Sequence, residues 1–201
     1  MQWTGLQDAF YRSESKKEVY IMSRNKTGRL LCFVLRHHPE AIGITVDEHG
    51  WADVEALVRG MQTKMRFSRE ELDELVRDDE KQRYTYNADR SKIRANQGHS
   101  IPVDLEMEAL VPPDVLWHGS ARRFDPSIQE YGLIPGSRLH VHLSSDPATA
   151  KAVGARHGAP VVYEVLSGQM YQDGYTFYRS QNGVWLTKAV PARYLNYYSV
   201  D

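Results

Sequence analysis

Residues 98–113 divide the chain into two parts with different hydrophobic patterns. This stretch carries Pro102, Pro112 and Pro113 and little periodic structure, which is typical of a linker. Before it, apolar residues recur at helical spacing, and after it they occur in short runs typical of strands. A chain of 201 residues is long enough for two small domains. The sequence therefore predicts an α+β protein with two lobes, joined by a linker at residues 101–113.

The N-terminal part is predicted to hold three helices followed by a hairpin. Pro39 is expected to end the first helix and Asp53 to cap the second. Residues 68–71, Ser-Arg-Glu-Glu, have the form of a capping box for the third helix. Residues 84–86 and 92–94 are expected to form two short strands. This order of elements is that of a winged helix, a variation on the helix-turn-helix.

The C-terminal part alternates short apolar runs with turn residues. Strands are expected at residues 115–117, 140–143, 161–165 and 183–186. Short helices are expected at residues 128–132 and 147–154, the second capped by Asp146. We therefore expect a mixed α/β lobe over residues 114–201.

The N-terminal lobe is expected to span residues 21–100, preceded by an extension at residues 1–20 without the apolar segment of a signal peptide. No run approaches the roughly 18 apolar residues that cross a bilayer. Cys32 is the only cysteine, so an internal disulfide cannot form, which suits a reducing compartment. We expect a cytoplasmic protein with no membrane partner. No heptad pattern indicates a dimer, so we expect a monomer.

The net charge of −1 argues against an indiscriminate nucleic-acid binder, because such proteins are usually basic overall. Recognition of RNA would then depend on a few cations in a compact site. The sequence contains no Gly-rich phosphate loop, no dinucleotide fingerprint and no nucleophile-elbow serine. A bound dinucleotide would therefore need another kind of fold.

Two segments of the N-terminal part combine cations with imidazole or glycine. Arg36 and His37 fall at the end of the first helix, where an arginine fork suits phosphate oxygens and a histidine can move a proton near neutral pH. Arg94 ends a strand and precedes Gly98, which lets the backbone approach an anion. Taken singly, the first segment is explained as well by a surface arginine with a capping histidine, and the second by a polar loop between lobes.

In the C-terminal part, His118, Gly119 and Ser120 follow a strand and could face a flat amide and ribose or phosphate oxygens. Taken alone, a strand-ending turn explains this segment equally well. His140 and His142 share one face of a strand because they are two residues apart. That spacing raises the question of a metal, but no nearby cysteine or carboxylate has ligand spacing, so we expect no metal.

Together and in this order, these segments are specific. They are 33–39 (FVLRHHP), 93–100 (IRANQGHS), 117–120 (WHGS), 140–144 (HVHLS) and 182–186 (NGVWL). On them the chain resembles the RNA 2′-phosphotransferase family, also called tRNA 2′-phosphotransferases, from about Leu30 to about Tyr194. Trp117 stands where tyrosine is common in the family, and Ser120 where threonine is common.

The resemblance implies a winged-helix N-terminal lobe that binds RNA and a C-terminal lobe, similar to ADP-ribosyltransferases, that binds NAD. In the family the RNA 2′-phosphate attacks the nicotinamide ribose of NAD, giving an ADP-ribosylated RNA 2′-phosphate and nicotinamide. The 2″-hydroxyl then attacks phosphorus, which gives 2′-hydroxyl RNA and ADP-ribose 1″,2″-cyclic phosphate. The implied partners are 2′-phosphorylated RNA and NAD as a co-substrate.

The resemblance also implies roles for individual residues. The family's catalytic Arg-His-Arg-Arg set is carried over to Arg36, His37, Arg94 and Arg138, with Arg156 as the competing choice for the fourth position. The implied NAD-binding residues are His118, Gly119, Ser120, His140, His142, Ser144 and Arg156.

Three other functions explain these residues less completely. A non-enzymatic binder of ADP-ribose or RNA ends would not need Arg36, His37 and Arg94 together. A protein ADP-ribosyltransferase usually places an acidic residue near NAD, for which Glu164 is the candidate. A DNA-binding winged-helix regulator leaves the C-terminal lobe unexplained.

Overall fold

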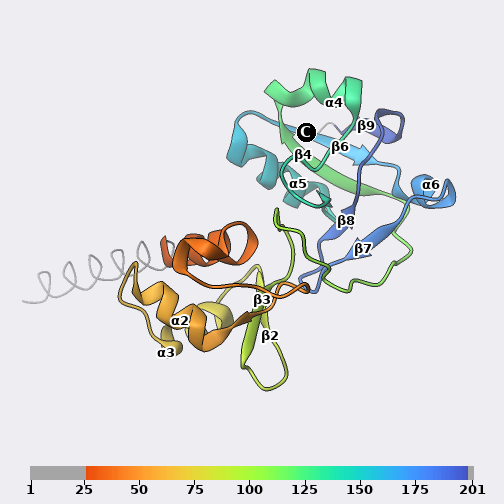
Figure 1. Cartoon of the computed structure of the whole chain (residues 1–201). Coiled ribbons are helices and arrows are strands. Elements are labelled where there is room, and N and C mark those ends of the chain that lie inside the picture. Colours follow the sequence, from red (N-terminus) through yellow and green to blue (C-terminus); the bar gives the residue numbers. More distant parts are fainter. Residues whose placement is uncertain (1–25, 199–201) are drawn as a thin grey trace, which may run out of the picture.

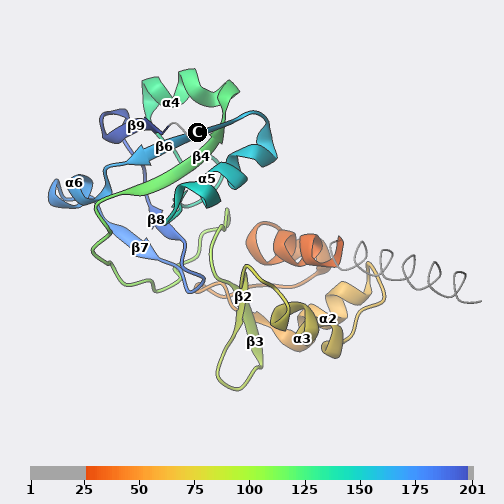
Figure 2. The ribbon, with the colours of Figure 1, turned by 180° about the vertical axis from the view of Figure 1, so that it is seen from behind.

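A computed structural model describes residues 26–198, so the expected extension at residues 1–20 lies outside the described residues. The buried apolar side chains form one core within residues 31–95 and another within residues 116–195. Figures 1 and 2 show the corresponding parts of the chain as two neighbouring masses, connected by the stretch that contains residues 101–113. The protein has mixed α/β structure with small antiparallel sheets.

The helices of the N-terminal part begin and end where local chemistry favours it. Residues 26–36 are helical, and Pro39 then opens the 3-10 helix η1 (Pro39–Ile42). The Asp53 carboxylate caps α2 (Val54–Gln62) by accepting from the Ala56 backbone N–H at 2.7 Å. Ser68 and Glu71 form both hydrogen bonds of a capping box at the start of α3 (Arg69–Arg77). The expected caps of both helices are confirmed.

The expected hairpin is also confirmed. It consists of β2 (Tyr84–Tyr86) and β3 (Lys92–Ala95), which pair in antiparallel fashion. A strand of two residues, β1 (Ala52–Asp53), pairs with the other edge of β3, so the sheet order is β1-β3-β2. The sequence did not indicate β1, because two residues are too few to show an alternating pattern.

The C-terminal part holds two three-stranded antiparallel sheets. One has the order β4 (Leu116–Ala121), β6 (Pro160–Val165) and β9 (Leu195–Tyr198). The other has the order β5 (Val141–Leu143), β8 (Trp185–Thr187) and β7 (Phe177–Arg179). Trp117 and Ser144 exchange two backbone hydrogen bonds, of 3.0 and 2.8 Å, and so link β4 to the residue after β5.

Short helices connect the strands of these sheets along the chain. They are η2 (Arg122–Phe124), α4 (Asp125–Tyr131), α5 (Pro147–Gly154), η3 (Ala155–His157), α6 (Ser167–Gln172) and η4 (Ala192–Tyr194). Asp146 caps α5 as expected, through a 2.7 Å bond from the Thr149 backbone N–H. Helix α5 approaches β4 so closely that a Cβ on Gly119 would lie 1.6 Å from the Ala150 carbonyl oxygen. Glycine is therefore required there by packing.

Within the part of the chain that the structure describes, no helix is both long enough and apolar enough to cross a bilayer. Among the same residues, no three His, Cys, Asp or Glu side chains come together in a group that could hold a metal ion.

Candidate active site

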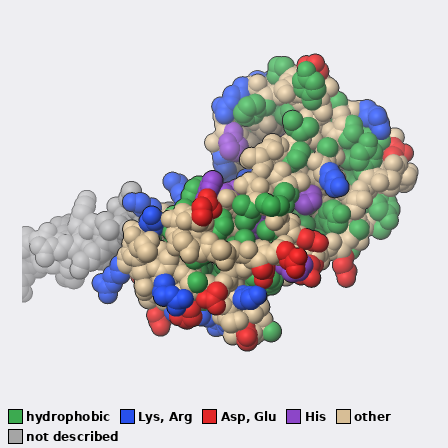
Figure 3. Space-filling model, in the orientation of Figure 1, with side chains coloured by type: hydrophobic (Ala, Val, Ile, Leu, Met, Phe, Trp, Pro, Cys, Tyr) green, Lys and Arg blue, Asp and Glu red, His purple; other side chains and the backbone are tan. Residues whose placement is uncertain are grey.

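A cavity of about 520 Å³ lies between the two parts of the chain and takes its walls from both. Figure 3 shows Lys, Arg and His side chains bordering the notch between the two masses. Most of the residues that the sequence predicted for the site line this cavity. They are Arg36, His118, Gly119, Ser120, Arg138, His140, His142, Ser144 and Arg156.

The cavity is strongly cationic. Lys81 and four arginines line it, whereas no Asp or Glu is among its described lining residues. Burial lowers the pKa of Lys81, and the charges of Arg156 and Arg83 lower it further. Burial and the charge of Arg36 likewise lower the pKa of Arg138. In a chain whose net charge is −1, this concentration of cations is suited to a ligand with several negative charges.

The Arg36 guanidinium lines the cavity and is suited to bind an anion. Its Nε and Nη2 atoms are buried and have no hydrogen-bond partner among residues 26–198. Leaving a buried charged donor unpaired is unfavourable, and bidentate phosphate oxygens match the guanidinium fork. The two free donors of Arg36 are therefore suited to the oxygens of an anion such as a phosphate.

His37 does not line the cavity but stands at its edge. Its pKa is lowered by burial first, and then by the charges of Arg36, Arg138 and His38. The imidazole is therefore neutral at pH 7. Its Nδ1 atom lies 2.8 Å from the hydroxyl oxygen of Ser100. A neutral imidazole beside a phosphate site can accept a proton and return it.

The structure does not bring Arg94 to this cavity. On β3, Ile93 and Ala95 point into the core, so Arg94 faces the opposite side of the strand. Its guanidinium lies 4.4 Å from the centroid of the Trp51 ring and donates to the His49 carbonyl oxygen at 3.3 Å. Arg94 lines a different cavity, of about 280 Å³.

Arg83, which the sequence analysis did not single out, lines the cavity where Arg94 was expected. It lies directly before β2, lines the main cavity and forms an ion pair with Asp79. Lys81, two residues earlier, lines the same cavity. The signal in the sequence was a pair of cations two residues apart, directly before an expected strand.

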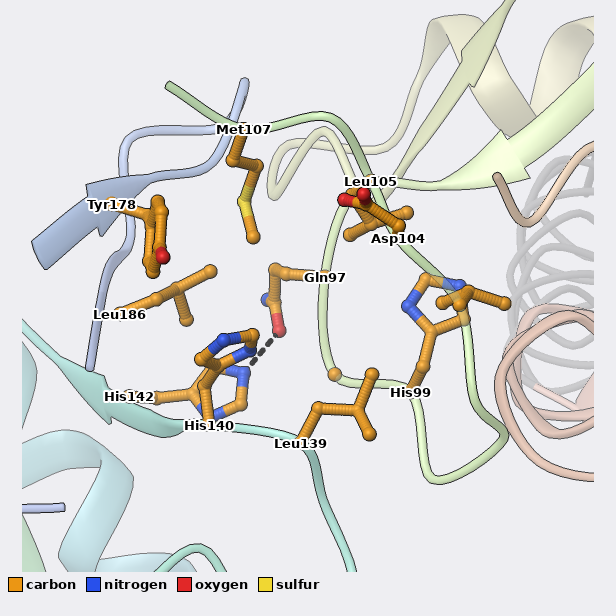
Figure 4. Close-up of a pocket in the computed structure, with 12 residues that line it drawn as sticks. Gln97, His99, Asp104, Leu105, Met107, Leu139, His140, His142, Tyr178 and Leu186 are labelled. Atoms are coloured by element: carbon orange, nitrogen blue, oxygen red, sulfur yellow. Dashed lines mark hydrogen bonds between the residues drawn. The ribbon is translucent and has the colours of Figure 1, made fainter. Parts of the chain in front are cut away.

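The opposite wall of the cavity carries two oriented histidines. The His118 Nδ1–H donates to the His142 carbonyl oxygen at 3.0 Å, which leaves Nε2 as the acceptor. The His142 Nε2–H donates to the Gln97 side-chain oxygen at 2.6 Å, as Figure 4 shows. Burial, Arg138 and Arg36 lower the pKa of His142 to about 3, so this imidazole is neutral at pH 7.

Figure 4 also shows a smaller cavity, of about 260 Å³, that shares Gln97, His140 and His142 with the main one. The His140 ring meets Tyr178 edge-on at 5.8 Å between centroids. His140 and His142 therefore line both cavities, and each ring has a defined neighbour: Tyr178 for His140 and Gln97 for His142.

Glu164, the acidic residue considered for a protein ADP-ribosyltransferase, lies on β6 and is not among the described residues of the cavity wall. Its carboxylate accepts from the Asn196 amide at 3.4 Å. Its position gives no support to that alternative.

Comparison with known proteins agrees with these observations. Residues 22–189 match the family model described as RNA 2'-phosphotransferase, Tpt1 / KptA family. A protein of Pseudomonas paraeruginosa named "Probable RNA 2'-phosphotransferase" is 50% identical over 171 residues, which covers 84% of this chain and 94% of that protein. A protein of the same name from Flavobacterium johnsoniae is 48% identical over 172 residues, covering 85% and 94%. The chain belongs to the RNA 2′-phosphotransferase family.

Proposed function

We propose that this protein removes a 2′-phosphate from RNA and transfers it to NAD. The observation that carries the proposal is the cavity in which five cationic side chains face one another without a carboxylate among the described lining residues. A phosphomonoester dianion and the pyrophosphate of NAD both need such charge neutralisation. The membership of the chain in its family supports the choice of RNA as the phosphate donor.

The RNA 2′-phosphate is placed against Arg36, Arg83 and Arg138, with His37 beside it. Arg83 replaces Arg94 in this set, because Arg83 lines the cavity and Arg94 does not. Arginine forks hold and aim phosphate oxygens, which lowers the barrier by positioning.

NAD is placed along the wall formed by the C-terminal part, where the lining residues fit a dinucleotide. Arg156 and Lys81 supply charge for the pyrophosphate, and His118, Ser120 and Ser144 supply polar groups for the ribose. NAD would supply an electrophilic anomeric carbon with a cationic leaving group. The cavity volume of about 520 Å³ falls within the usual range of ligand sites, roughly 300–1,000 Å³.

The first step forms a bond between a 2′-phosphate oxygen and the anomeric carbon, while the bond to nicotinamide breaks. The electron pair of the broken bond stays with nicotinamide and neutralises its pyridinium nitrogen, so nicotinamide leaves without taking up a proton. In the second step the 2″-hydroxyl oxygen attacks phosphorus and the bond to the RNA 2′-oxygen breaks. His37 takes the proton of the 2″-hydroxyl and gives it to the RNA oxygen, while the arginines stabilise the charge on phosphorus.

In the same proposal the N-terminal part, residues 21–100, is a winged-helix lobe that binds RNA. The C-terminal part, residues 114–201, is an ADP-ribosyltransferase-like lobe that binds NAD. The order of three helices and a hairpin supports the first assignment, and the wall of His118 and His142 supports the second. The protein would act as a monomer in the cytoplasm.

Mixing the protein with NAD and an oligonucleotide that carries one internal 2′-phosphate tests the proposal. Nicotinamide, 2′-hydroxyl RNA and ADP-ribose cyclic phosphate are expected in equal amounts. His37→Ala should stall after the first step, so that ADP-ribosylated RNA accumulates. Release of inorganic phosphate without consumption of NAD would rule the proposed reaction out.

A further inference from the structure

Residues 97–100 lie at the junction between the two walls of the site. The Ser100 backbone N–H donates to the Arg36 carbonyl oxygen at 3.0 Å, which ties the segment to the end of the first helix. The His99 carbonyl oxygen accepts from the Leu139 N–H at 3.0 Å, which ties it to the residue after Arg138. One short segment is thus bonded to Arg36 and to the neighbour of Arg138, two of the three arginines proposed for the phosphate site.

Ser100 also contacts the catalytic candidate His37 through its side chain. The Ser100 hydroxyl oxygen and the His37 Nδ1 atom are 2.8 Å apart. This bond occupies one ring nitrogen and leaves Nε2 available to a substrate. Because the backbone of Ser100 is bonded to the residue before His37, the hydroxyl is held at a fixed position relative to the ring.

Gln97 makes the corresponding bond on the other wall. Its side-chain oxygen accepts from the His142 Nε2–H at 2.6 Å (Figure 4). The neutral imidazole of His142 therefore carries its proton on Nε2, and its ring orientation is set by a residue of the N-terminal part.

Gly98, between these two residues, gives the Arg36 side chain room to pass. It has a φ of +89°, and a Cβ at this position would lie 3.4 Å from Nη1 of Arg36. The positive φ favours glycine, and an added Cβ would lie in van der Waals contact with the guanidinium.

We propose that Ser100 and Gln97 are positioning residues that orient His37 and His142, so that one segment sets both walls of the site at once. The inference rests on the proposed function, since it assigns the two histidines to phosphate transfer and to NAD. A segment that merely connects the two parts would need the backbone bonds but neither side-chain bond. The two side chains therefore distinguish positioning from simple connection.

The first experiment compares Ser100→Ala and Ser100→Thr with Ser127→Ala, a matched change at an exposed serine of α4. Imidazole ¹⁵N spectra of His37 report its tautomer and pKa without any need for activity. In Ser100→Ala we expect the spectrum of a single tautomer to become that of a mixture. We also expect turnover to fall at least about tenfold, with ADP-ribosylated RNA accumulating. Ser100→Thr should restore both, and Ser127→Ala should change neither.

The second experiment uses Gln97→Met, which keeps the length of the side chain and removes its amide. The His142 Nε2–H resonance should shift or broaden, and KM for NAD should rise about tenfold, while the His37 spectrum stays as in the wild type. Ser100→Ala should show the reverse pattern, with KM for NAD unchanged.

Unchanged imidazole spectra in both variants would overturn the proposal, even if turnover fell, because the effect would then not act through the histidines. Altered spectra with wild-type kinetics would overturn it as well. If the wild-type protein transfers no phosphate to NAD, the proposed function fails. The spectra then still decide whether Ser100 and Gln97 orient the two rings.

Discussion

Arg83 and Arg94 illustrate how two arginines of one sheet come to have different tasks. Arg83 precedes β2 and faces the main cavity, whereas Arg94 stacks on Trp51 on the far side of β3. An arginine stacked on an aromatic ring contributes about 0.5–2 kcal/mol to stability, through contacts that lysine does not reproduce. We therefore assign Arg94 to the stability of the N-terminal part.

Replacing each of these arginines by lysine separates the two tasks. Arg83→Lys should lower kcat for phosphate transfer about 100-fold, because lysine cannot hold phosphate oxygens with a planar fork. Arg94→Lys should leave kcat near the wild-type value and lower the free energy of unfolding by about 1 kcal/mol. Kinetics and urea unfolding of both variants measure the effects. The opposite pattern, with transfer lost only in Arg94→Lys, would return Arg94 to the catalytic set.

His99 makes stability depend on pH. It is 1% exposed, and burial with the charges of Arg36, His37 and Arg94 lowers its pKa from 6.5 to about 4. Between these two values the unfolded chain binds more protons than the folded one, so stability is full above pH 6.5 and declines as pH falls toward 4. His99 alone should make the protein about 2 kcal/mol less stable at pH 5 than at pH 7.

Urea unfolding of the wild type and His99→Gln at pH 5 and 7 checks this expectation. The variant should lose about 2 kcal/mol less between the two pH values than the wild type. The remaining slope is expected from other groups, His142 among them, whose pKa is also lowered by burial. An equal slope in both proteins would show that His99 is not held neutral in the folded state.

At the scale of elements, the packing of β4 on α5 depends on the absence of one side chain. Gly119→Ala would place a Cβ 1.6 Å from a backbone oxygen of α5, so strand and helix must separate. We expect a loss of at least about 3 kcal/mol and a matching fall in Tm. Gly28 lies in the helix of residues 26–36, and a Cβ there meets nothing within 4 Å. Gly28→Ala should therefore raise stability by about 0.5–1 kcal/mol. Equal destabilisation by both changes would refute the packing argument.

The elements that were predicted from the sequence are those with strong local signals. The capping box at Ser68, the cap at Asp146 and the hairpin around residues 87–91 are confirmed because each depends on neighbours along the chain. Strands β7 and β9 and helix α6 were not predicted. Each is short, so its residues are too few to show a clear period, and β7 and β9 are defined by antiparallel pairing with β8 and β6.

Some residues of the candidate site were also predicted from the sequence, and others were not. Arg36, at the end of the first helix, and His118, in β4, line the expected cavity. Arg94 was placed there because it lies in a characteristic segment, but strand alternation turns its side chain away. Arg83 and Lys81 were missed because their approach to the C-terminal part depends on tertiary contacts. One of these is the 2.8 Å bond from the Asn182 amide to the Lys81 carbonyl oxygen.

At the scale of the whole molecule, ligand binding in a cavity with two walls should stabilise the entire fold. A ligand at 100 times its Kd adds about 2.7 kcal/mol to the folded state, which for a chain of this size corresponds to roughly 5–11 °C in Tm. Saturating NAD should raise Tm by that amount, and adenosine alone by much less, because it lacks the pyrophosphate that the cations would bind. No change in Tm at millimolar NAD would contradict the assignment of the cavity.

Arg36 and Arg83 come from one part of the chain and Arg138 and Arg156 from the other, so neither part holds the whole cationic cavity by itself. A chimera that joined halves from two distant relatives would keep both hydrophobic cores and could still fold. Its turnover would fall, however, wherever Gln97 of one parent failed to match the histidine at position 142 of the other. On the proposed function, exchanging one half among relatives would therefore change the contacts that the other half makes at the cavity.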